Sequence, residues 1–184
     1  MSDFDVTPAL GSVVESDRGS LPFALIHGEA LVACAAWALG EAGVTPVDFT
    51  TGWASIVESG EPFVLHDPLC PMTPADFVAR CVQTAVERDA VVVAVRPVTD
   101  TVKTVTDGLV GDTVDRAGLV EVTSPIVLPP AVVAALPEAP TGDFAAIAAG
   151  LAARFPVTTL EAPAAGRRVD DLDDLRMLEA LTQR

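Results

Sequence analysis

The segment from Ala90 to Val95 constrains the fold of this chain more than any other, because its six residues are all apolar and four of them are valine. Valine favours β-strands, and a strand without polar alternation is buried on both faces of its sheet. A helical pattern from Thr73 to about Arg88 leads directly into this strand. Helices that alternate with buried strands cover both faces of a parallel sheet. The sequence therefore predicts an α/β domain with three layers and an open, mostly parallel sheet.

The rest of the chain has similar patterns and predicts a single domain over residues 1–184. Hydrophobic residues make up 50% of the chain and charged residues 20%, which is typical of a well-filled interior. Thr73, Pro74 and Asp76 form a capping signature that places the Thr73 hydroxyl at the N-cap of a helix. Other helices are expected at 28–42, 51–59, 130–136, 143–154 and 171–182, and other strands at 47–49, 62–66, 120–128 and 157–160.

Residues 98–119 are predicted to leave the sheet as a protruding β-arm. The pair Asp107-Gly108 is a strong hairpin signal, and it lies between two strand-like segments, Thr101–Val105 and Leu109–Val110. A hairpin of this length is not stable in water by itself. We therefore expect the arm to pair with its counterpart in a two-fold homodimer.

The net charge of the chain disfavours nucleic acids and anionic membranes as partners. It is −15, from 26 acidic and 11 basic residues, and such a charge repels nucleic-acid backbones and anionic membrane surfaces. The N-terminal residues are acidic, and no apolar run approaches the length of a membrane span. We therefore expect a cytoplasmic protein that binds neither nucleic acid nor membrane.

The three cysteines do not form a metal-ligand spacing, so reduced thiols are expected. Cys70 with His66 would still need further ligands to hold a metal.

Basic residues are concentrated in the second half of the chain. Lys103 is the only lysine, and Arg18 is the only lysine or arginine before Arg80. Arg18 follows Ser16 and Asp17 in a polar stretch, and we interpret it as a solvated loop residue. Any chemistry that binds anions must then draw on the second half.

Five segments carry a resemblance to a known family. The segment His66–Pro71 resembles that family's His-Asp-Ala-Ala-Arg-Pro turn, and Val95–Lys103 resembles its Pro-Val-x-Asp-Thr-x-Lys segment. Thr113–Leu119 resembles its Asp-Arg motif, Ser124-Pro125 its Thr-Pro-Gln strand, and Arg168-Val169 its Lys-Val ending. The family is that of the methylerythritol phosphate cytidylyltransferases of isoprenoid precursor synthesis, and this chain resembles a divergent member of it. The resemblance implies a Rossmann-like nucleotidyltransferase fold.

The same resemblance implies an activity and a set of site residues. Family members transfer a cytidylyl group from CTP onto a sugar-alcohol phosphate, with Mg²⁺ as cofactor, and the arm's arginine reaches across a dimer. The catalytic residues that it implies are Arg168 and Arg116. The implied substrate-binding residues are Asp67, Thr101, Lys103, Arg116 and Ser124. For the nucleotide they are Ala9, Gly11 and Asp67, and Asp67 is also the implied metal ligand.

The departures from the family fall on residues that handle phosphate. The family's glycine-rich turn and its lysine are expected between Val6 and Leu25, yet only Gly11 remains in the turn and the lysine position is Leu21. Cys70 stands where the family has an arginine. Triphosphates are held by close backbone N–H groups and by lysine or arginine. Two functions therefore remain open: an active cytidylyltransferase, or a non-catalytic relative that acts as a binding or regulatory partner. A third is an unrelated small-molecule binder that shares only the open-sheet architecture.

Several of these residues also have a purely structural interpretation. Asp67 follows a strand and is either a ligand of the nucleotide and metal or a cap of its own turn. We interpret His66 as a packing residue at a strand end, because no acidic partner is apparent. Arg116 either contacts a substrate or pairs with Asp112 or Asp115.

The charges near the C-terminus are also open to two interpretations. The doublet Arg167-Arg168 either binds an anion or balances the acidic residues that follow it. Those acids, between Asp170 and Asp174, are better explained by the last helix than by a cation site. Asp170 or Asp171 is expected to be the N-cap of that helix.

Overall fold

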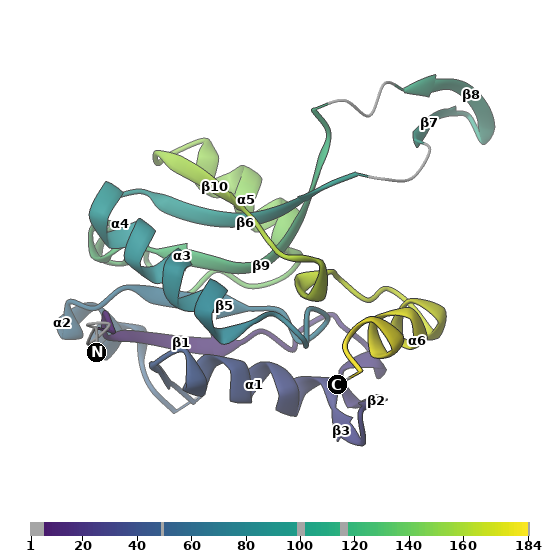
Figure 1. The fold of residues 1–184 in the computed structure, drawn as a ribbon. Coiled ribbons are helices and arrows are strands. Elements are labelled where there is room, and N and C mark those ends of the chain that lie inside the picture. The colour runs from purple at the N-terminus through teal and green to yellow at the C-terminus, as the bar shows by residue number, and fades with distance from the viewer. Residues whose placement is uncertain (1–5, 49, 99–101, 115–117, 184) are drawn as a thin grey trace.

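The computed structural model describes residues 6–48, 50–98, 102–114 and 118–183, and these residues form a six-stranded sheet with helices on both faces (Figure 1). The strand order is β10-β6-β9-β5-β1-β4. All neighbouring strands are parallel except β9, which runs antiparallel to both β5 and β6. The predicted open, mostly parallel sheet is thus confirmed. Its strands are β1 (Ala9–Val13), β4 (Val44–Pro46), β5 (Phe63–His66), β6 (Val91–Pro97), β9 (Val120–Leu128) and β10 (Val157–Glu161).

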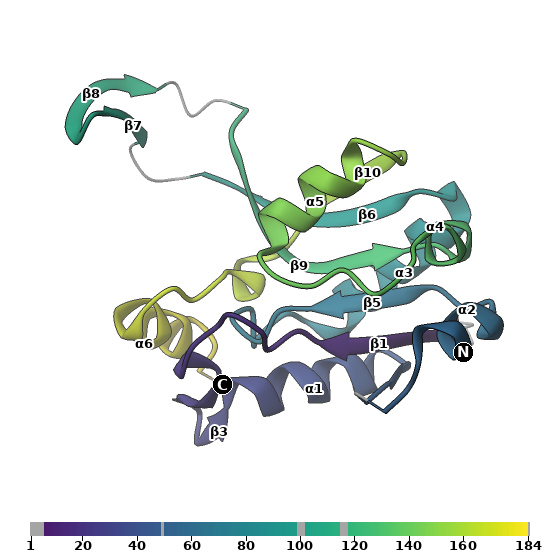
Figure 2. The same ribbon diagram turned by 180° about the vertical axis from the view of Figure 1, so that it is seen from behind.

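Alternate side chains of the central strands enter two different hydrophobic layers. Phe63 and Leu65 pack with residues from α2 (Trp53–Ser59), α4 (Pro130–Ala135) and α5 (Phe144–Ala152). Val64, between them, packs on the opposite face with residues from α1 (Leu31–Glu41) and α3 (Ala75–Arg88). Figures 1 and 2 show the two helical layers from opposite sides. The predicted three-layer arrangement follows from this alternation.

A smaller hydrophobic cluster lies beyond the carboxyl end of β5, where the chain leaves the sheet. It contains residues from β2 (Leu25–Ile26), α1, the loop after β5 and α6 (Leu172–Leu181). Two short 3₁₀ helices, η1 (Leu21–Phe23) and η2 (Ala164–Gly166), and strand β3 (Glu29–Ala30) complete this end of the molecule. The Val169 N–H donates to the Leu69 carbonyl oxygen at 2.7 Å, which ties the C-terminal segment to the loop after β5.

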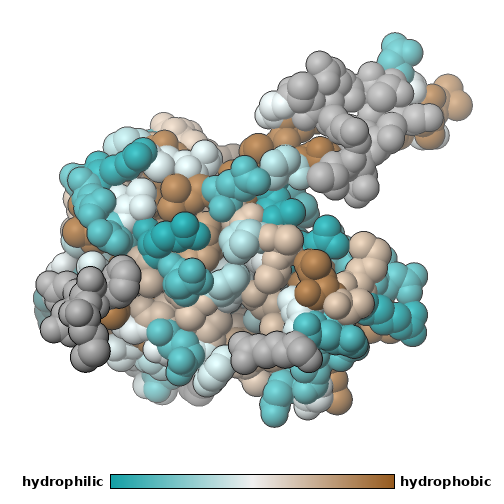
Figure 3. All heavy atoms as spheres, in the orientation of Figure 1, coloured by the Kyte–Doolittle hydropathy of each residue, from teal (hydrophilic) through white to brown (hydrophobic). Residues whose placement is uncertain are grey.

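The arm is a separate antiparallel hairpin of β7 (Val102–Thr106) and β8 (Leu109–Val114). It projects away from the body in both views (Figures 1 and 2). Asp107 and Gly108 form its turn with φ angles of 51° and 78°, a left-handed conformation that suits an Asp-Gly turn. Leu109 is 74% exposed, and hydrophobic surface is visible on the arm in Figure 3. The predicted protruding arm is confirmed, whereas its pairing with a second copy stays a prediction.

Two short elements differ from the sequence-based expectation. The strand expected at 47–49 is found at Val44–Pro46, because the parallel ladder with β1 pairs Ala9 with Val44. Thr73 is not the N-cap of α3: the N-cap is Pro74, and the Thr73 hydroxyl donates instead to the Cys70 carbonyl oxygen at 2.8 Å. Asp171, by contrast, is the N-cap of α6, as expected, and its carboxylate accepts from two backbone N–H groups of the first turn.

Among the described residues, no helix has the length and apolar character needed to cross a membrane.

Candidate functional site

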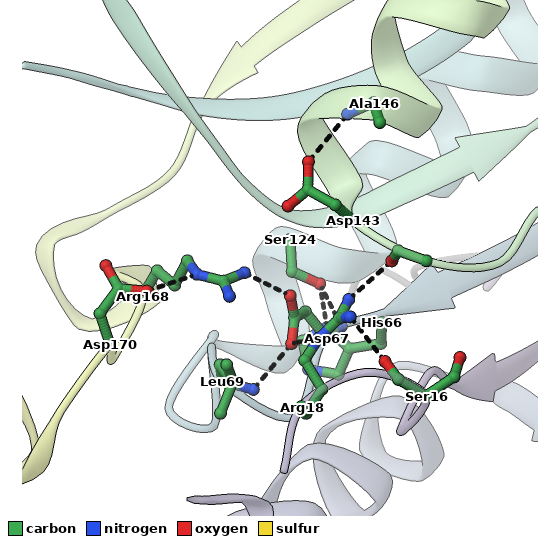
Figure 4. A network of polar contacts seen from close by, with 11 residues as sticks. Ser16, Arg18, His66, Asp67, Leu69, Ser124, Asp143, Ala146, Arg168 and Asp170 are labelled. Atoms are coloured by element: carbon green, nitrogen blue, oxygen red, sulfur yellow. Dashed lines mark hydrogen bonds and ion pairs between the residues drawn. The ribbon is translucent and has the colours of Figure 1, made fainter.

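Asp67 is the centre of a buried polar network at the carboxyl end of β5 (Figure 4). Its Oδ1 atom accepts from Arg18 Nε at 3.1 Å and from the Leu69 N–H at 2.9 Å. Its Oδ2 atom accepts from an Arg168 NH1 atom at 2.8 Å. The residue is 0% exposed. The predicted role as a cap of its own turn is therefore visible, and Asp67 also binds two arginines from distant segments, whereas its role toward a nucleotide and metal stays a prediction.

Arg18 lies in the loop between β1 and η1 and is buried, so the prediction of a solvated loop residue is wrong. Besides Asp67, its guanidinium donates to the Ser16 carbonyl oxygen at 2.8 Å and to the Gly142 carbonyl oxygen at 3.0 Å. It also lies 5.6 Å from the ring centre of Phe144. Burial is tolerated because the carboxylate compensates the charge and carbonyl groups satisfy other N–H donors.

Arg168 approaches Asp67 from the other side, on the segment before α6. Its Nε atom also donates to Asp170 Oδ1 at 2.8 Å. Burial acts to lower the pKa of the Arg168 guanidinium, but the hydrogen bond to Asp170 and the charge of Asp67 outweigh it and raise the pKa above its ordinary value. Arg168 therefore stays charged and links a buried carboxylate to an exposed one.

His66 and Ser124 form a second hydrogen-bonded pair next to Asp67. Ser124 Oγ accepts from the Asp67 N–H at 2.9 Å and is hydrogen-bonded to His66 Nδ1. Burial lowers the pKa of His66 to about 4, and the nearby charge of Asp67 only partly opposes this. His66 Nε2 is buried and has no hydrogen-bond partner among the described residues. His66 is thus a neutral, enclosed residue at a strand end, as predicted, with no access for a substrate.

Two positions that the resemblance pairs with family cations, Leu21 and Cys70, are apolar or neutral here. Cys70 is 0% exposed, and burial raises the pKa of its thiol well above its ordinary value. Leu21 begins η1 and packs against the hydrophobic cluster that includes Leu69 and Val169. The side chain of Leu21 therefore contributes to packing and not to charge.

Two cavities border this network. One, of about 640 Å³, lies at the carboxyl ends of β1 and β4, and its charged lining residues are Glu15 and Asp48. The other, of about 380 Å³, lies at the base of the arm beside Arg168. Charges of both signs line it: Arg96, Glu121, Arg167, Arg168, Asp170 and Asp174. Burial, together with the charge of Asp170, raises the pKa of Glu121.

The structure brings together three of the predicted site residues, Asp67, Ser124 and Arg168. Ala9 and Gly11, by contrast, were expected in a nucleotide-binding turn, and this placement is wrong because both are buried inside β1. A Cβ atom on Gly11 would lie 2.7 Å from Val44 Cγ1 and 2.9 Å from the Val64 carbonyl oxygen, so this glycine serves close strand packing.

Three of the predicted site residues belong to the arm. Thr101 and Arg116 lie outside the described residues, and Lys103 lies in β7 on the arm. Arg18 was missed as a member of the network, although its status as the only lysine or arginine in the first 79 residues could have singled it out.

The described residues do not fit a Mg²⁺ ion at Asp67. Magnesium in proteins is held by one or two carboxylates together with substrate phosphates. Both Asp67 oxygens already accept hydrogen bonds from arginines, whose positive charges would repel a cation at the same place. No cluster of three or more His, Cys, Asp or Glu side chains that could hold a metal occurs among the described residues. The arrangement neutralises and encloses the carboxylate.

Comparisons with known proteins agree with the geometry of the fold. A curated relative, the bifunctional enzyme IspD/IspF of Nitratidesulfovibrio vulgaris, is 40% identical over 74 residues, which is 40% of this chain and 19% of the relative. The chain thus matches about a fifth of the length of that relative.

Two crystal structures are similar over nearly their whole length. The 2-C-methyl-D-erythritol 4-phosphate cytidylyltransferase of Thermus thermophilus is 22% identical, with 93% of this chain and 96% of that chain covered and a TM-score of 0.67. The 4-diphosphocytidyl-2C-methyl-D-erythritol synthase of Anaerococcus prevotii is 14% identical, with coverage of 96% and 98% and a TM-score of 0.65. These likenesses show the fold. The sequence model of the 2-C-methyl-D-erythritol 4-phosphate cytidylyltransferases matches residues 49–147, which is more than half of the chain, and this protein therefore belongs to that family.

Proposed function

We propose that this chain is a non-catalytic member of the cytidylyltransferase family, which keeps the fold and the arm and acts as a binding or regulatory partner. One observation carries the proposal: both carboxylate oxygens of Asp67 are bound by arginines inside the protein, Arg18 at 3.1 Å and Arg168 at 2.8 Å. The family resemblance assigns Asp67 to the nucleotide and its metal. In this chain those interactions are replaced by internal ion pairs.

The loop after β1 adds a second argument. A triphosphate needs cations to neutralise the charge that develops during transfer. Arg18 is the only cation of that loop. Its guanidinium donates hydrogen bonds to Asp67 and to two carbonyl oxygens, and it lies over the Phe144 ring. Leu21 packs into a hydrophobic cluster where the family has lysine. The adjoining cavity is lined by Glu15 and Asp48, which repel phosphate.

The second candidate is an active CTP-dependent cytidylyltransferase that acts on a sugar-alcohol phosphate. It is favoured by the proximity of Asp67, Ser124 and Arg168, which the resemblance assigns to substrates, next to a cavity of about 380 Å³. For this function Arg18 would have to leave Asp67 and give up three hydrogen bonds.

Pyrophosphate release distinguishes the two candidates. The purified chain is incubated with CTP, methylerythritol phosphate and Mg²⁺, with the Thermus thermophilus relative as the positive control. Loss of one transition-state donor costs about 100-fold to 1,000-fold, so with two cationic positions lost we expect a rate at least about 10,000-fold below that of the relative. Turnover within about 100-fold of the relative would refute the proposal. Residual activity counts only if Arg168→Met abolishes it, because a contaminating host enzyme would be unaffected.

Calorimetry with CTP provides a second measurement that does not depend on turnover. We expect no heat of binding at micromolar concentrations, because Asp67 is enclosed and the larger cavity is acidic. Micromolar binding of CTP together with turnover would support the active enzyme instead.

We also propose that the arm joins two copies of the chain. The hairpin of β7 and β8 stands apart from the body, and Val105, Leu109 and Val110 are each at least 66% exposed. Pairing with the arm of a second copy would bury these side chains and cover exposed strand edges.

A further inference from the structure

A groove along α1 combines an exposed tryptophan with two carboxylates. Its main part, of about 580 Å³, lies between α1 and the segment from Pro71 to Ala75. A second hollow, of about 350 Å³, adjoins it, and Glu29, Cys34 and Trp37 line both. Trp37 therefore stands between two hollows, and it is 69% exposed. None of these lining residues belongs to the network around Asp67.

The positions on α1 place the aromatic ring and a carboxylate side by side. Trp37 and Glu41 are four residues apart, so their side chains share one face of the helix. Glu29 comes from β3, which leads directly into the helix. The floor beneath them is apolar and includes Ile26 and Ala38, both buried. An apolar hollow with a few charged groups at its rim is a common form of binding site.

The charges at the rim have no cationic partner in the part of the chain that the structure describes. Among those residues, no ion pair reaches Glu29 or Glu41, and no lysine or arginine lines either hollow. His27 is occupied, since its ring contacts Thr182 Oγ1 at 2.7 Å and its backbone N–H donates to Glu179. The net charge of −15 adds a long-range attraction for cations.

We propose that this groove binds an arginine-containing segment of a partner protein. A guanidinium stacks on the face of an indole ring and donates hydrogen bonds to carboxylates in a forked geometry. Trp37 provides the indole ring, and Glu29 and Glu41 provide the carboxylates. The aliphatic part of the arginine side chain, with a neighbouring apolar residue, fits the floor of the groove. Tryptophan also dominates the energetics of many protein interfaces. The proposal deepens the proposed function, because it names the chemistry of a binding partner.

The first test measures binding of blocked hexapeptides to the full chain by calorimetry. The probe carries three arginines separated by leucine and alanine, and two further peptides replace arginine with lysine or with citrulline. Citrulline keeps the shape of arginine and removes its charge. We expect the arginine peptide to bind, the lysine peptide to bind several-fold more weakly, and the citrulline peptide not to bind. Equal binding of the arginine and citrulline peptides would overturn the proposal, as would no binding of the arginine peptide at millimolar concentration.

Variants then locate the site. Trp37→Ala is expected to weaken binding of the arginine peptide about tenfold or more, and Trp37→Leu nearly as much, because leucine keeps the apolar contact but loses the ring face. The double variant Glu29→Gln/Glu41→Gln is expected to have a similar effect. Its matched control, Glu58→Gln/Glu138→Gln, removes the same charge from residues that line neither hollow. Equal weakening by the two double variants would contradict a local site and indicate non-specific attraction.

The size of the ligand is tested separately. Arginine amide alone is expected to bind much more weakly than the hexapeptide, since it cannot occupy the apolar floor. If arginine amide binds as tightly as the peptide, the site takes a small cation and the proposal of a protein partner fails. None of these measurements involves CTP, so the groove and the proposed loss of catalysis can fail independently.

Discussion

Arg18 Nε and Asp67 Oδ1 lie 3.1 Å apart although the two residues are 49 positions apart in the chain, and their side chains are only 3% and 1% exposed. A buried pair of this kind is costly to break, because the remaining partner is left as an uncompensated charge away from water. Here a second arginine, Arg168, shares the same carboxylate. Removing the carboxylate would therefore leave two cations facing each other.

Asp67→Asn is expected to lower the free energy of unfolding by about 3 to 5 kcal/mol, since it leaves Arg18 without its counter-charge. Urea denaturation monitored by circular dichroism measures the change. The control is Asp173→Asn, which breaks the exposed pair with Arg176. The control is expected to cost at most about 1 kcal/mol. Similar losses for the two variants would show that burial does not determine the strength of the Asp67 network.

Stability is expected to fall as the pH is lowered from about 6.5 to about 4, in part because of His66. Burial lowers its pKa from 6.5 to about 4 in the folded protein, so the unfolded chain binds more protons over this interval. The contribution is fully present above pH 6.5, decreases as the pH falls, and is lost below about pH 4. A shift of this size corresponds to about 3 kcal/mol.

The variant His66→Gln isolates that contribution, because glutamine does not titrate. We expect its free energy of unfolding to change less between pH 7 and pH 4.5 than that of the original chain, whatever its stability at pH 7. His27→Gln, which replaces the other histidine at an exposed position, is the matched control. An unchanged slope in His66→Gln would rule out His66 as the titrating group.

Gly11→Ala is expected to destabilise the sheet by about 1 to 3 kcal/mol or more, because the new Cβ atom would meet the backbone of β5 at 2.9 Å. Gly150→Ala is the comparison. Gly150 lies in α5, where an added Cβ atom would meet no other atom within 4 Å, and alanine there should stabilise the helix by about 0.5 to 1 kcal/mol. Thermal unfolding of both variants measures these two opposite changes in stability. A Gly11→Ala protein as stable as the original chain would show that β1, β4 and β5 can separate to accept a methyl group.

Removal of residues 99–117, with Val98 joined to Gly118, is expected to convert the proposed dimer into a monomer. The base of the arm should close normally, because the Val98 N–H already donates to the Leu119 carbonyl oxygen at 3.1 Å. Sedimentation at micromolar concentration compares the two proteins. A monomeric full chain would contradict the dimer, and a dimer that persists after the deletion would show that another surface holds it together.

The parts of the fold that were predictable depend on local patterns. Ala90–Val95 is recognisable as a strand because a strand buried on both faces needs continuous apolar residues. Asp107-Gly108 identifies the arm because few sequences suit its turn. The burial of Arg18 could not be predicted in this way, since it depends on Asp67 and on Gly142, 124 positions away. Gly11 was misplaced for the same reason, because the atoms that exclude a side chain there come from neighbouring strands.

The position of β9 between β5 and β6 also affects the order in which this protein can assemble during synthesis. When residue 97 has been added, β5 and β6 are complete, but they pair with β9 and not with each other. One edge of β5 and one edge of β6 then remain unpaired until residue 128 has been added, which takes roughly 2 to 6 seconds at typical elongation rates. The other edge of β6 stays unpaired until β10 has been added. During that interval the nascent chain exposes strand edges that attract other chains and chaperones. The arm occupies most of the intervening residues, so every residue added to it would prolong the interval.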